Sequence, residues 1–371
     1  MKILHINRNY IDTPLHQLMV EKLEKLGHKN AVFVPRFCGE ESTVTPNVNA
    51  IVCECFKQWH RLFYGYKQRK IIRAAETAMD CEECDLIHAY TVFTDGNCAR
   101  ELSKKHNIPY VVSVRNTDIN GFFRLMPHLR GRGIRIMRDA AAIFFLSDSY
   151  KQQVFDQYVP LKYRTELEAK THIIPNGIDD FWFDNQPETS LEIADTIKLI
   201  YAGRIDRNKN IPTTQKAMQI LRERGYDVLL TVVGRVEDKK VFKMIKRDPY
   251  TQCLPAQPKE SLLDIYRAHN IFVMPSFTES FGLVYAEALS QGLPVIYTKG
   301  QGFDNQFPEG VVGYHVSAYD AVDVADGIEK VIKNYSNIIP NTVSSAKVFN
   351  WTEITSRYDG IYKTILEESG D

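Results

Sequence analysis

The sequence lacks an excess of either charge, because 46 Lys and Arg residues balance 46 Asp and Glu residues. A nucleic-acid partner is therefore not expected, since such partners favour an overall basic protein. No uncharged apolar run approaches the ~20 residues that span a bilayer, and the N-terminus, MKILHINRNY, has no signal-peptide core. The composition of 44% apolar and 25% charged residues excludes wholesale disorder, and we expect a globular, cytoplasmic protein.

Cysteine is scarce and odd in number, with seven residues among 371. A disulfide framework is not expected in a chain without a secretion signal, and the simplest interpretation is free thiols. The alternative is a zinc site in which Cys53 and Cys55 join Cys81 and Cys84, although Cys-x-Cys is an atypical spacing for zinc ligands.

Short apolar, β-rich runs alternate with amphipathic segments of helix length along the whole chain. Such alternation indicates parallel sheets covered by helices on both faces. The pattern breaks between residues 180 and 195, which predicts one domain over 1–185, a second over 186–350, and a helix over 351–371 that packs back towards the first. The expected strands are Lys2–Ile6, Ala31–Val34, Leu86–Tyr90, Tyr110–Val114, Ile143–Leu146, His172–Pro175, Leu199–Ala202, Leu229–Gly234, Ile271–Pro275 and Pro294–Tyr297.

Functional residues are expected where these strands end, because paired doubly wound domains bind ligands at the carboxyl ends of their strands. The strongest motif follows the strand at Ile271 and enters a helix that we expect to begin near Gly282 or Leu283 and to end at Gly292. The first N–H groups of that helix have no intrahelical partner and form an anion site.

Two carboxylates flank this anion site: Glu279 precedes the helix, and Glu287 is placed about two turns inside it. Carboxylates accept hydrogen bonds from hydroxyls, so the pair suits a sugar at one end of the anion site and a ribose at the other. The alternative is a capping charge at Glu279 and a solvated helix residue at Glu287.

A second motif brings cations into another loop between a strand and a helix. Arg204 and Lys209 lie in this loop, and together they can neutralise a diphosphate. The alternative is a solvated basic loop in which Asp206 offsets one charge. Arg235, which follows the next strand, is a similar but weaker candidate.

These motifs resemble those of the retaining glycosyltransferases of family 4. The resemblance rests on Glu279-x7-Glu287, on the Gly-Arg…Lys loop and on Pro175-Asn-Gly-Ile-Asp179, and it covers most of the chain. It implies the GT-B fold, an α/β architecture in which two doubly wound Rossmann-like domains face each other across a cleft. The first domain would bind the acceptor and the second the nucleotide-sugar donor. The resemblance also implies that no metal is needed, and the sequence contains no Asp-x-Asp motif of the metal-dependent fold.

The resemblance assigns a role to each motif. Arg204 and Lys209 would hold the donor diphosphate and stabilise the leaving nucleotide, and Glu279 would contact the hydroxyls of the donor sugar. Glu287 would bind the ribose, and the segment Gln252–Leu254 would line the base pocket. No cofactor is implied beyond the donor itself. The residues expected to bind the donor are Glu287, Ser280, Phe281, Gly282, Leu283, Val284, Arg235 and Leu254.

The N-terminal half departs from the family pattern at Arg115-Asn-Thr-Asp118, where many members have His-Gly-x-Asp. A guanidinium cannot act as a base at neutral pH. Either Arg115 binds the donor or an anionic acceptor, or the leaving phosphate itself takes the acceptor proton. Asp118 is expected to contact the acceptor, Arg8 is a weaker candidate for a phosphate contact, and His88 for lining the cleft. The expected catalytic residues are Glu279, Arg204, Lys209, Arg115 and Asp118.

Two stretches of the N-terminal half, Lys57–Arg73 and Phe122–Arg138, are basic and aromatic and contain no acid. They suit the surface of an anionic membrane into which Trp59, Phe63, Phe122 and Phe123 dip. Such contact fits an acceptor anchored on a polyprenyl diphosphate. The alternatives are a solvated face, or arginines that bind an anionic acceptor.

We therefore expect a retaining, metal-independent hexosyltransferase that moves a sugar from a nucleotide-diphosphate sugar to a saccharide or lipid-linked acceptor. It would act in the synthesis of a cell-surface polysaccharide or glycolipid, at the inner face of the cell membrane. The alternatives are a nucleotide-sugar isomerase (epimerase) and a catalytically dead nucleotide-sugar-binding protein. A dinucleotide oxidoreductase fits less well, because no Gly-x-Gly-x-x-Gly follows the first strand.

Overall fold

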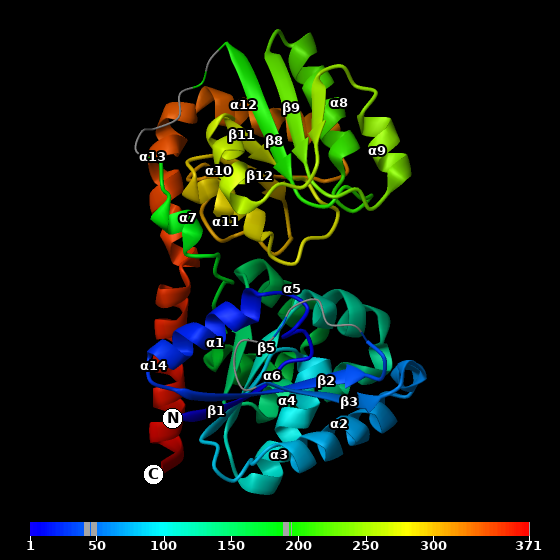
Figure 1. Ribbon diagram of the computed structural model, residues 1–371, viewed down its shortest axis with the longest axis vertical. Coiled ribbons are helices and arrows are strands. Elements are labelled where there is room, and N and C mark those ends of the chain that lie inside the picture. Colours follow the sequence, from blue (N-terminus) through cyan, green and yellow to red (C-terminus); the bar gives the residue numbers. More distant parts are fainter. Residues whose placement is uncertain (41–44, 46–49, 188–192, 194, 371) are drawn as a thin grey trace. The chain divides into compact units, whose positions relative to one another are not determined.

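The computed structural model describes residues 1–40, 45, 50–187, 193 and 195–370. The chain forms two compact units (Figure 1). The first comprises Met1–Leu146, Tyr150–Gly177 and Trp351–Asp371, and the second comprises Ser147–Ser149 and Ile178–Asn350. The chain therefore passes between the units after Gly177, upstream of the border expected at residue 185, and most of the polar stretch after Pro187 lies outside the described residues.

The first unit is built on a seven-stranded sheet with the order β3-β2-β1-β4-β5-β6-β7. Every neighbouring pair of strands is parallel. The strands are β1 (Lys2–Ile6), β2 (Lys29–Phe37), β3 (Ala50–Phe56), β4 (Leu86–Ala89), β5 (Tyr110–Val114), β6 (Ala142–Phe145) and β7 (Thr171–Ile173). The helices of this unit are α1 (Leu15–Lys25), α2 (Tyr64–Ala78), α3 (Asn97–His106), α4 (Arg130–Asp139), α5 (Asp148–Tyr158, whose first two residues belong to the second unit), α6 (Leu161–Ala169) and α14 (Trp351–Gly370).

Successive residues of the central strands bury opposite faces of this sheet. Ile87 of β4 and Val112 of β5 pack into a core with α2, α3 and α4, whereas Leu86 and Val111 pack into a core with α1 and α14. A strand that is covered on both faces has no solvent side, which explains why these strands are apolar at nearly every position.

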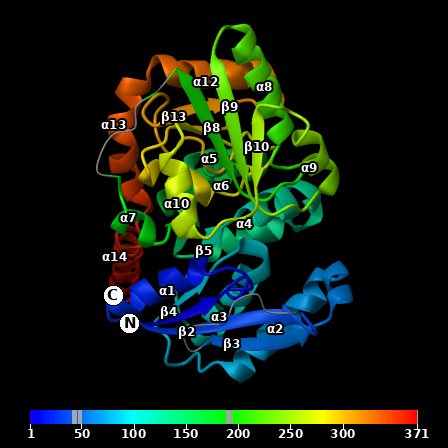
Figure 2. The ribbon, with the colours of Figure 1, turned by 45° about the horizontal axis from the view of Figure 1, so that its top comes forward.

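The second unit repeats the plan with a six-stranded parallel sheet in the order β10-β9-β8-β11-β12-β13. Figure 2 shows β8, β9 and β10 side by side in this sheet. Its strands are β8 (Thr196–Ala202), β9 (Asp227–Val233), β10 (Thr251–Leu254), β11 (Ile271–Val273), β12 (Val295–Thr298) and β13 (Gly313–Val316). Its helices are α7 (Phe181–Asp184), α8 (Ile211–Glu223), α9 (Lys239–Ile245), α10 (Lys259–Arg267), α11 (Leu283–Ser290), α12 (Ala321–Lys333) and α13 (Tyr335–Ala346). The predicted α/β class with two doubly wound, Rossmann-like domains is confirmed.

Three strands were not predicted from the sequence: β3, β10 and β13. All three lie at an edge of their sheet. An edge strand has only one neighbour and can leave side chains in water, so it does not need a continuous apolar run. The segment AIVCECF of β3 illustrates this, because only its last residue is fully buried.

The C-terminal helix α14 completes the core of the first unit, alongside α1 (Figure 1). Trp351, Ile354, Tyr358 and Tyr362 recur at helical spacing and are almost completely buried. They pack against residues of β1, β4, β5 and β6. None of the helices in the described part of the chain is both long enough and apolar enough to cross a membrane.

We predict that Trp351→Ala lowers the free energy of unfolding of the first unit by about 3–5 kcal/mol, because a large side chain with 2% exposure leaves a cavity behind. Urea denaturation followed by circular dichroism measures the change. Ser356→Ala, on the exposed side of the same helix, is the control and should shift the value by less than about 0.5 kcal/mol. Equal effects of the two substitutions would contradict the packing of α14.

Candidate active site

The candidate donor site lies where β8 and β11 stand side by side in the second sheet. The connections of the sheet run in opposite directions from this pair, towards β9 and towards β12, so a crevice forms at the carboxyl ends of the two strands. The loop after β8 carries Arg204 and Lys209, and the loop after β11 carries Glu279. The fold thus brings together the two motifs that the sequence analysis singled out.

Asparagines of the β8 loop fasten it to the β11 loop. Asn208 donates from Nδ2 to the carbonyl oxygen of Thr278 (2.7 Å) and accepts at Oδ1 from the N–H of Thr278 (3.0 Å). Asn210 adopts the left-handed conformation (φ 56°) and donates to the carbonyl oxygens of Pro275 (3.0 Å) and Ala318 (2.6 Å). These asparagines were not predicted, although Asn-Lys-Asn in a loop is a composition that favours side-chain bonds to backbone.

An ion pair joins the two loops. Nζ of Lys209 lies 2.5 Å from Oε2 of Glu279, and each side chain is only 12% exposed. The N–H of Lys209 donates to Asp206 (3.0 Å), and the N–H of Glu279 donates to Oε1 of Gln301 (2.9 Å). A cation expected at the diphosphate and a carboxylate expected at the sugar therefore lie in direct contact.

The side chain of Arg204 is far more exposed than that of Lys209: 62% of its surface is accessible, and its nearest carboxylate, Asp206, is 3.8 Å away. The loop geometry fixes its backbone, since the hydroxyl of Tyr201 donates to the carbonyl oxygen of Arg204 (2.5 Å). Gly234 lies directly against this loop: a Cβ atom there would stand 1.7 Å from the carbonyl oxygen of Gly203. An exposed guanidinium on a loop whose backbone is held can turn towards an anion.

Helix α11 begins at Leu283, as predicted, and its N-terminal cap is Gly282. Gly282 has φ +77°, and a Cβ atom would lie 2.4 Å from the ring of Tyr285, so only glycine fits. The side chain of Phe281 is buried between Phe303 and Phe349, which leaves its backbone as the part that can meet a ligand. Ser280 is exposed, and Leu283 and Val284 are half-buried.

Glu287 lies one turn inside α11, not the two turns expected, because the helix begins at Leu283. Its carboxylate is half-buried and has no hydrogen-bond partner in the described part of the chain. Burial, and then the negative charge of Asp179, raise the pKa of Glu287 to about 7. The interpretation as a solvated helix residue does not fit this environment, and an unpartnered, half-buried carboxylate is suited to receive hydroxyl donors.

A pocket of about 510 Å³ adjoins the carboxyl ends of β9 and β10. Arg235 and Leu254, both expected at the donor, line it together with Phe242 and Pro255. Arg235 is 75% exposed and pairs with Glu237. The apolar walls and the single cation suit a planar base.

The expected residues of the first unit lie after β5. Arg115 is half-buried and donates from Nη1 to Oδ1 of Asn176 (2.9 Å). Asp118 is completely buried and accepts from the N–H groups of Phe93 (3.1 Å) and Arg115 (3.0 Å), and burial raises its pKa to about 6. The structure therefore places Asp118 as a support for neighbouring backbone and leaves none of its atoms exposed for an acceptor.

Two weaker candidates are engaged elsewhere in the first unit. His88 is fully buried and lies between Ser113 Oγ (3.0 Å) and the hydroxyl of Tyr362 (2.8 Å). Arg8 forms ion pairs with Asp12 (3.2 Å) and Glu40.

The seven cysteines are free thiols, as expected. Among the described residues, no three of the four cysteines considered as zinc ligands bring their sulfur atoms together.

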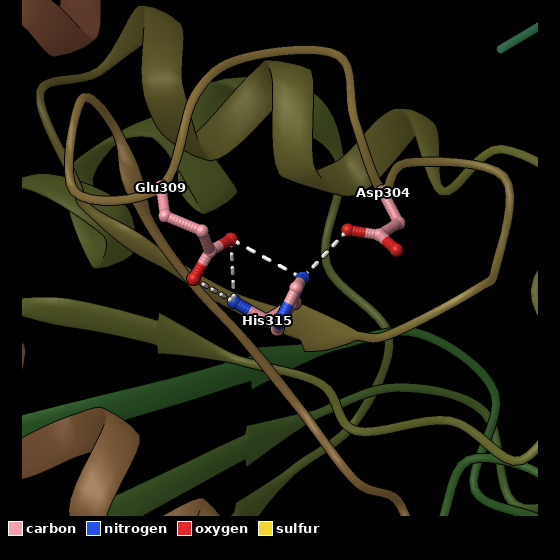
Figure 3. A group of neighbouring side chains, drawn as sticks. All are labelled: Asp304, Glu309 and His315. Atoms are coloured by element: carbon pink, nitrogen blue, oxygen red, sulfur yellow. Dashed lines mark hydrogen bonds and ion pairs between the residues drawn. The ribbon is translucent and has the colours of Figure 1, made fainter. Parts of the chain in front are cut away.

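One group of potential metal ligands gathers in the described part of the chain: Asp304, Glu309 and His315 (Figure 3). Nδ1 of His315 lies 2.9 Å from Oδ1 of Asp304 and 3.3 Å from Oε1 of Glu309, and its backbone N–H also donates to Glu309. Asp304 further accepts from the N–H of Gly300 (2.6 Å). The group ties the loop after β12 to β13, and this loop carries the Gln301 that holds Glu279.

The chain has two parallel sheets, each covered by helices and each with one point at which the strand order reverses. This architecture is that of the GT-B class of glycosyltransferase folds. Sucrose-phosphate synthase from Thermosynechococcus elongatus has a similar structure, with a TM-score of 0.75 and 18% identity over 99% of this chain and 100% of that chain. The profile "Glycosyltransferase Family 4" matches residues 17–180, and "Glycosyl transferases group 1" matches residues 183–344. The chain therefore belongs to family 4 of the glycosyltransferases, as the sequence motifs predicted.

Two relatives illustrate the range of the family. The D-inositol 3-phosphate glycosyltransferase of Pseudarthrobacter chlorophenolicus is 29% identical over 264 residues, which cover 66% of this chain and 61% of that protein. The capsular polysaccharide biosynthesis glycosyltransferase CapM of Staphylococcus aureus is 28% identical over 214 residues, which cover 52% of this chain and 54% of that protein. This chain thus spans less than two thirds of the length of either relative.

We predict that Lys209→Met and Glu279→Gln each lower the free energy of unfolding by about 2–4 kcal/mol, because each leaves its partner's charge buried and unpaired. The double variant should lose less than the sum of the two, and urea unfolding of the four proteins measures this coupling. Lys239→Met, on an exposed position of α9, is the control. Additive losses would contradict the ion pair.

We predict that Glu287→Gln stabilises the protein at pH 8 by about 3 kcal/mol and leaves its stability unchanged below pH 4.5. The folded protein holds this proton up to a pKa of about 7, whereas an ordinary Glu releases it near 4.5, so the wild type loses stability as the pH rises between these values. Urea unfolding across this range measures the difference. The same change at the exposed Glu223 should have no such effect, and a flat profile for both variants would contradict the assignment.

Proposed function

We propose that this chain transfers a sugar from a nucleotide-diphosphate sugar to a saccharide or lipid-linked acceptor, with retention at the anomeric carbon and without a metal. The observation that carries the proposal is the convergence at the β8/β11 switch point of Arg204, the Lys209–Glu279 ion pair and the N-terminus of α11. Two cations and a helix end together supply positive charge for a diphosphate.

The donor would be divided among the parts of this site. The base would occupy the pocket lined by Arg235 and Leu254, and the ribose hydroxyls would donate to Glu287. The diphosphate would lie on the α11 N–H groups with Lys209 and Arg204, and the donor sugar would meet Glu279. The name of CapM associates that relative with capsular polysaccharide, which supports a role in building a cell-surface polysaccharide or glycolipid.

The same groups would stabilise the departing nucleotide. The bond between the anomeric carbon and the diphosphate oxygen breaks, the acceptor oxygen bonds to that carbon on the same face, and the acceptor proton passes to the leaving phosphate. Negative charge grows on the diphosphate during this step, and Arg204 and Lys209 are placed to meet it. A double displacement would need a free carboxylate nucleophile, whereas Glu279 is paired with Lys209.

We predict that Arg204→Ala lowers the transfer rate by about 10²-fold or more without lowering the melting temperature, because its side chain is exposed in the free protein. Arg207→Ala is the matched control: Arg207 lies in the same loop, is 82% exposed and pairs with Asp238. Release of nucleoside diphosphate in the presence of a candidate acceptor measures the rate. Equal losses in both variants would contradict the phosphate assignment.

The proposal as a whole is tested with purified protein, a set of nucleotide sugars and the chelator EDTA. We expect one donor to raise the melting temperature, product of retained anomeric configuration by NMR, and full activity with chelator. Loss of activity with EDTA that divalent ions restore would contradict metal independence. Conversion of the donor without any acceptor would indicate an isomerase, and a donor that binds without turnover would indicate a binding protein.

A further inference from the structure

A second pocket, of about 590 Å³, lies in the first unit where β1 and β4 stand side by side. This is the switch point of that sheet, equivalent to the position of β8 and β11 in the other. Asn9 follows β1, Thr91 and Thr94 follow β4, and Thr117 follows β5, and all four line the pocket. Hydroxyl and amide groups of this kind hydrogen-bond the hydroxyls of a saccharide.

Buried carboxylates hold this polar end in place. Asp95 is fully buried and accepts from Oγ1 of Thr91 (2.9 Å) and from the N–H of Arg8 (3.3 Å). Asp118 fixes the turn after β5 through its bonds to Phe93 and Arg115. The groups that would meet a saccharide therefore stand on fixed backbone.

Apolar side chains from both acid-free stretches also line the pocket. Tyr64 and Phe122 meet edge to face with ring centroids 6.3 Å apart, and both line the pocket. Leu62 and Met126 also line it, although 81% and 36% of their surfaces remain exposed. Leu125, beside Met126, is 69% exposed. The mouth of the pocket thus presents apolar side chains to solvent.

Arg8, Glu40 and Lys67 line the pocket, and the two stretches that supply its apolar side chains are basic. The stretches Lys57–Arg73 and Phe122–Arg138 contain six and five Lys and Arg residues, respectively, and no acid. Arg138 pairs with Glu166. Eight other cations of these stretches make no ion pair with a carboxylate in the described part of the chain. They are Lys57, Arg69, Lys70, Arg73, Arg124, Arg130, Arg132 and Arg135.

We propose that this pocket and its mouth, the basic-apolar face formed by Lys57–Arg73 and Phe122–Arg138, bind a phosphate-linked lipid that carries the acceptor saccharide. The saccharide lies against the threonines, the phosphate lies among the unpaired cations, and the hydrocarbon chain lies over Leu62 and Leu125. A saccharide alone would not contact the exposed apolar side chains at the mouth. A neutral lipid would not neutralise the charge of the cations. This inference rests on the proposed function, because it names the acceptor class for that reaction.

The test uses the full chain and vesicles of phosphatidylcholine, alone or with about 30% phosphatidylglycerol. We expect sedimentation with the anionic vesicles only. Leu62→Ser combined with Leu125→Ser should weaken this binding about tenfold or more, since each leucine loses its apolar contact with lipid. Arg69→Ser combined with Arg73→Ser should also weaken it, by about thirtyfold at about 1 kcal/mol per cation.

Matched variants separate this face from the general surface. Leu161→Ser removes a leucine that is 79% exposed on α6 of the same unit, and Lys239→Ser combined with Lys243→Ser removes two exposed cations of α9. Neither should change vesicle binding. No binding to anionic vesicles, or equal losses in the test and control variants, would overturn the proposal.

A small amphiphile distinguishes an acceptor site from a membrane surface. Farnesyl phosphate should raise the melting temperature of the wild type, and inorganic phosphate and farnesol should not; the Leu62→Ser, Leu125→Ser protein should lose this response. Vesicle binding without a response to farnesyl phosphate would overturn the acceptor-lipid assignment. The same variant should keep its stabilisation by the nucleotide-sugar donor. A response to farnesyl phosphate without any donor binding would instead contradict the proposed function and leave this site standing.

Discussion

The contact between Lys209 and Glu279 is the interaction on which the candidate donor site depends. It closes two loops over a switch point and keeps a cation and a carboxylate almost out of water. Such a pair contributes little net stability, because desolvation offsets much of the attraction. The pair is neutral by itself and joins the two loops. In the proposed function, a phosphate that approaches Lys209 would meet a cation that is already positioned and largely stripped of water.

Around this pair, the site is built from backbone rather than from long side chains. Asn208 and Asn210 bind main-chain groups of the opposite loop, and Gln301 binds the backbone of Glu279. The Asp304 group then fixes the loop that carries Gln301. Each layer holds the next, so little conformational entropy is left to lose when a ligand binds. Arg204 is the exception, because its side chain is exposed. In the proposed function, this exposure would let it reach the charge that develops during the reaction.

The fold was largely predictable, because buried central strands leave a strong apolar signal. The strand Tyr110–Val114 was predicted to the residue. The edge strands β3, β10 and β13 were missed because their sequences mix polar and apolar residues, whereas the edge strand β7 was predicted. The candidate site was predictable as two separate motifs. Their contact was not, since the sequence records neither which strands are neighbours nor that Asn208 fastens the loops. The burial of Asp118 could not be predicted either. The sequence around an acid in a polar loop does not indicate whether its side chain points to solvent or accepts hydrogen bonds from backbone N–H groups.

Helix α14 belongs to the first unit. In the sequence, however, it follows the second unit, because residues 178–350 lie between α14 and the other elements of the first unit. Trp351, Tyr358 and Tyr362 complete one face of a sheet whose strands were all made before residue 174. During synthesis, α1 alone covers that face while the entire second unit emerges from the ribosome. By contrast, every strand and helix of the second unit has been synthesised once residue 350 is added. The second unit can therefore complete its folding before the first unit, which needs α14 to complete its core.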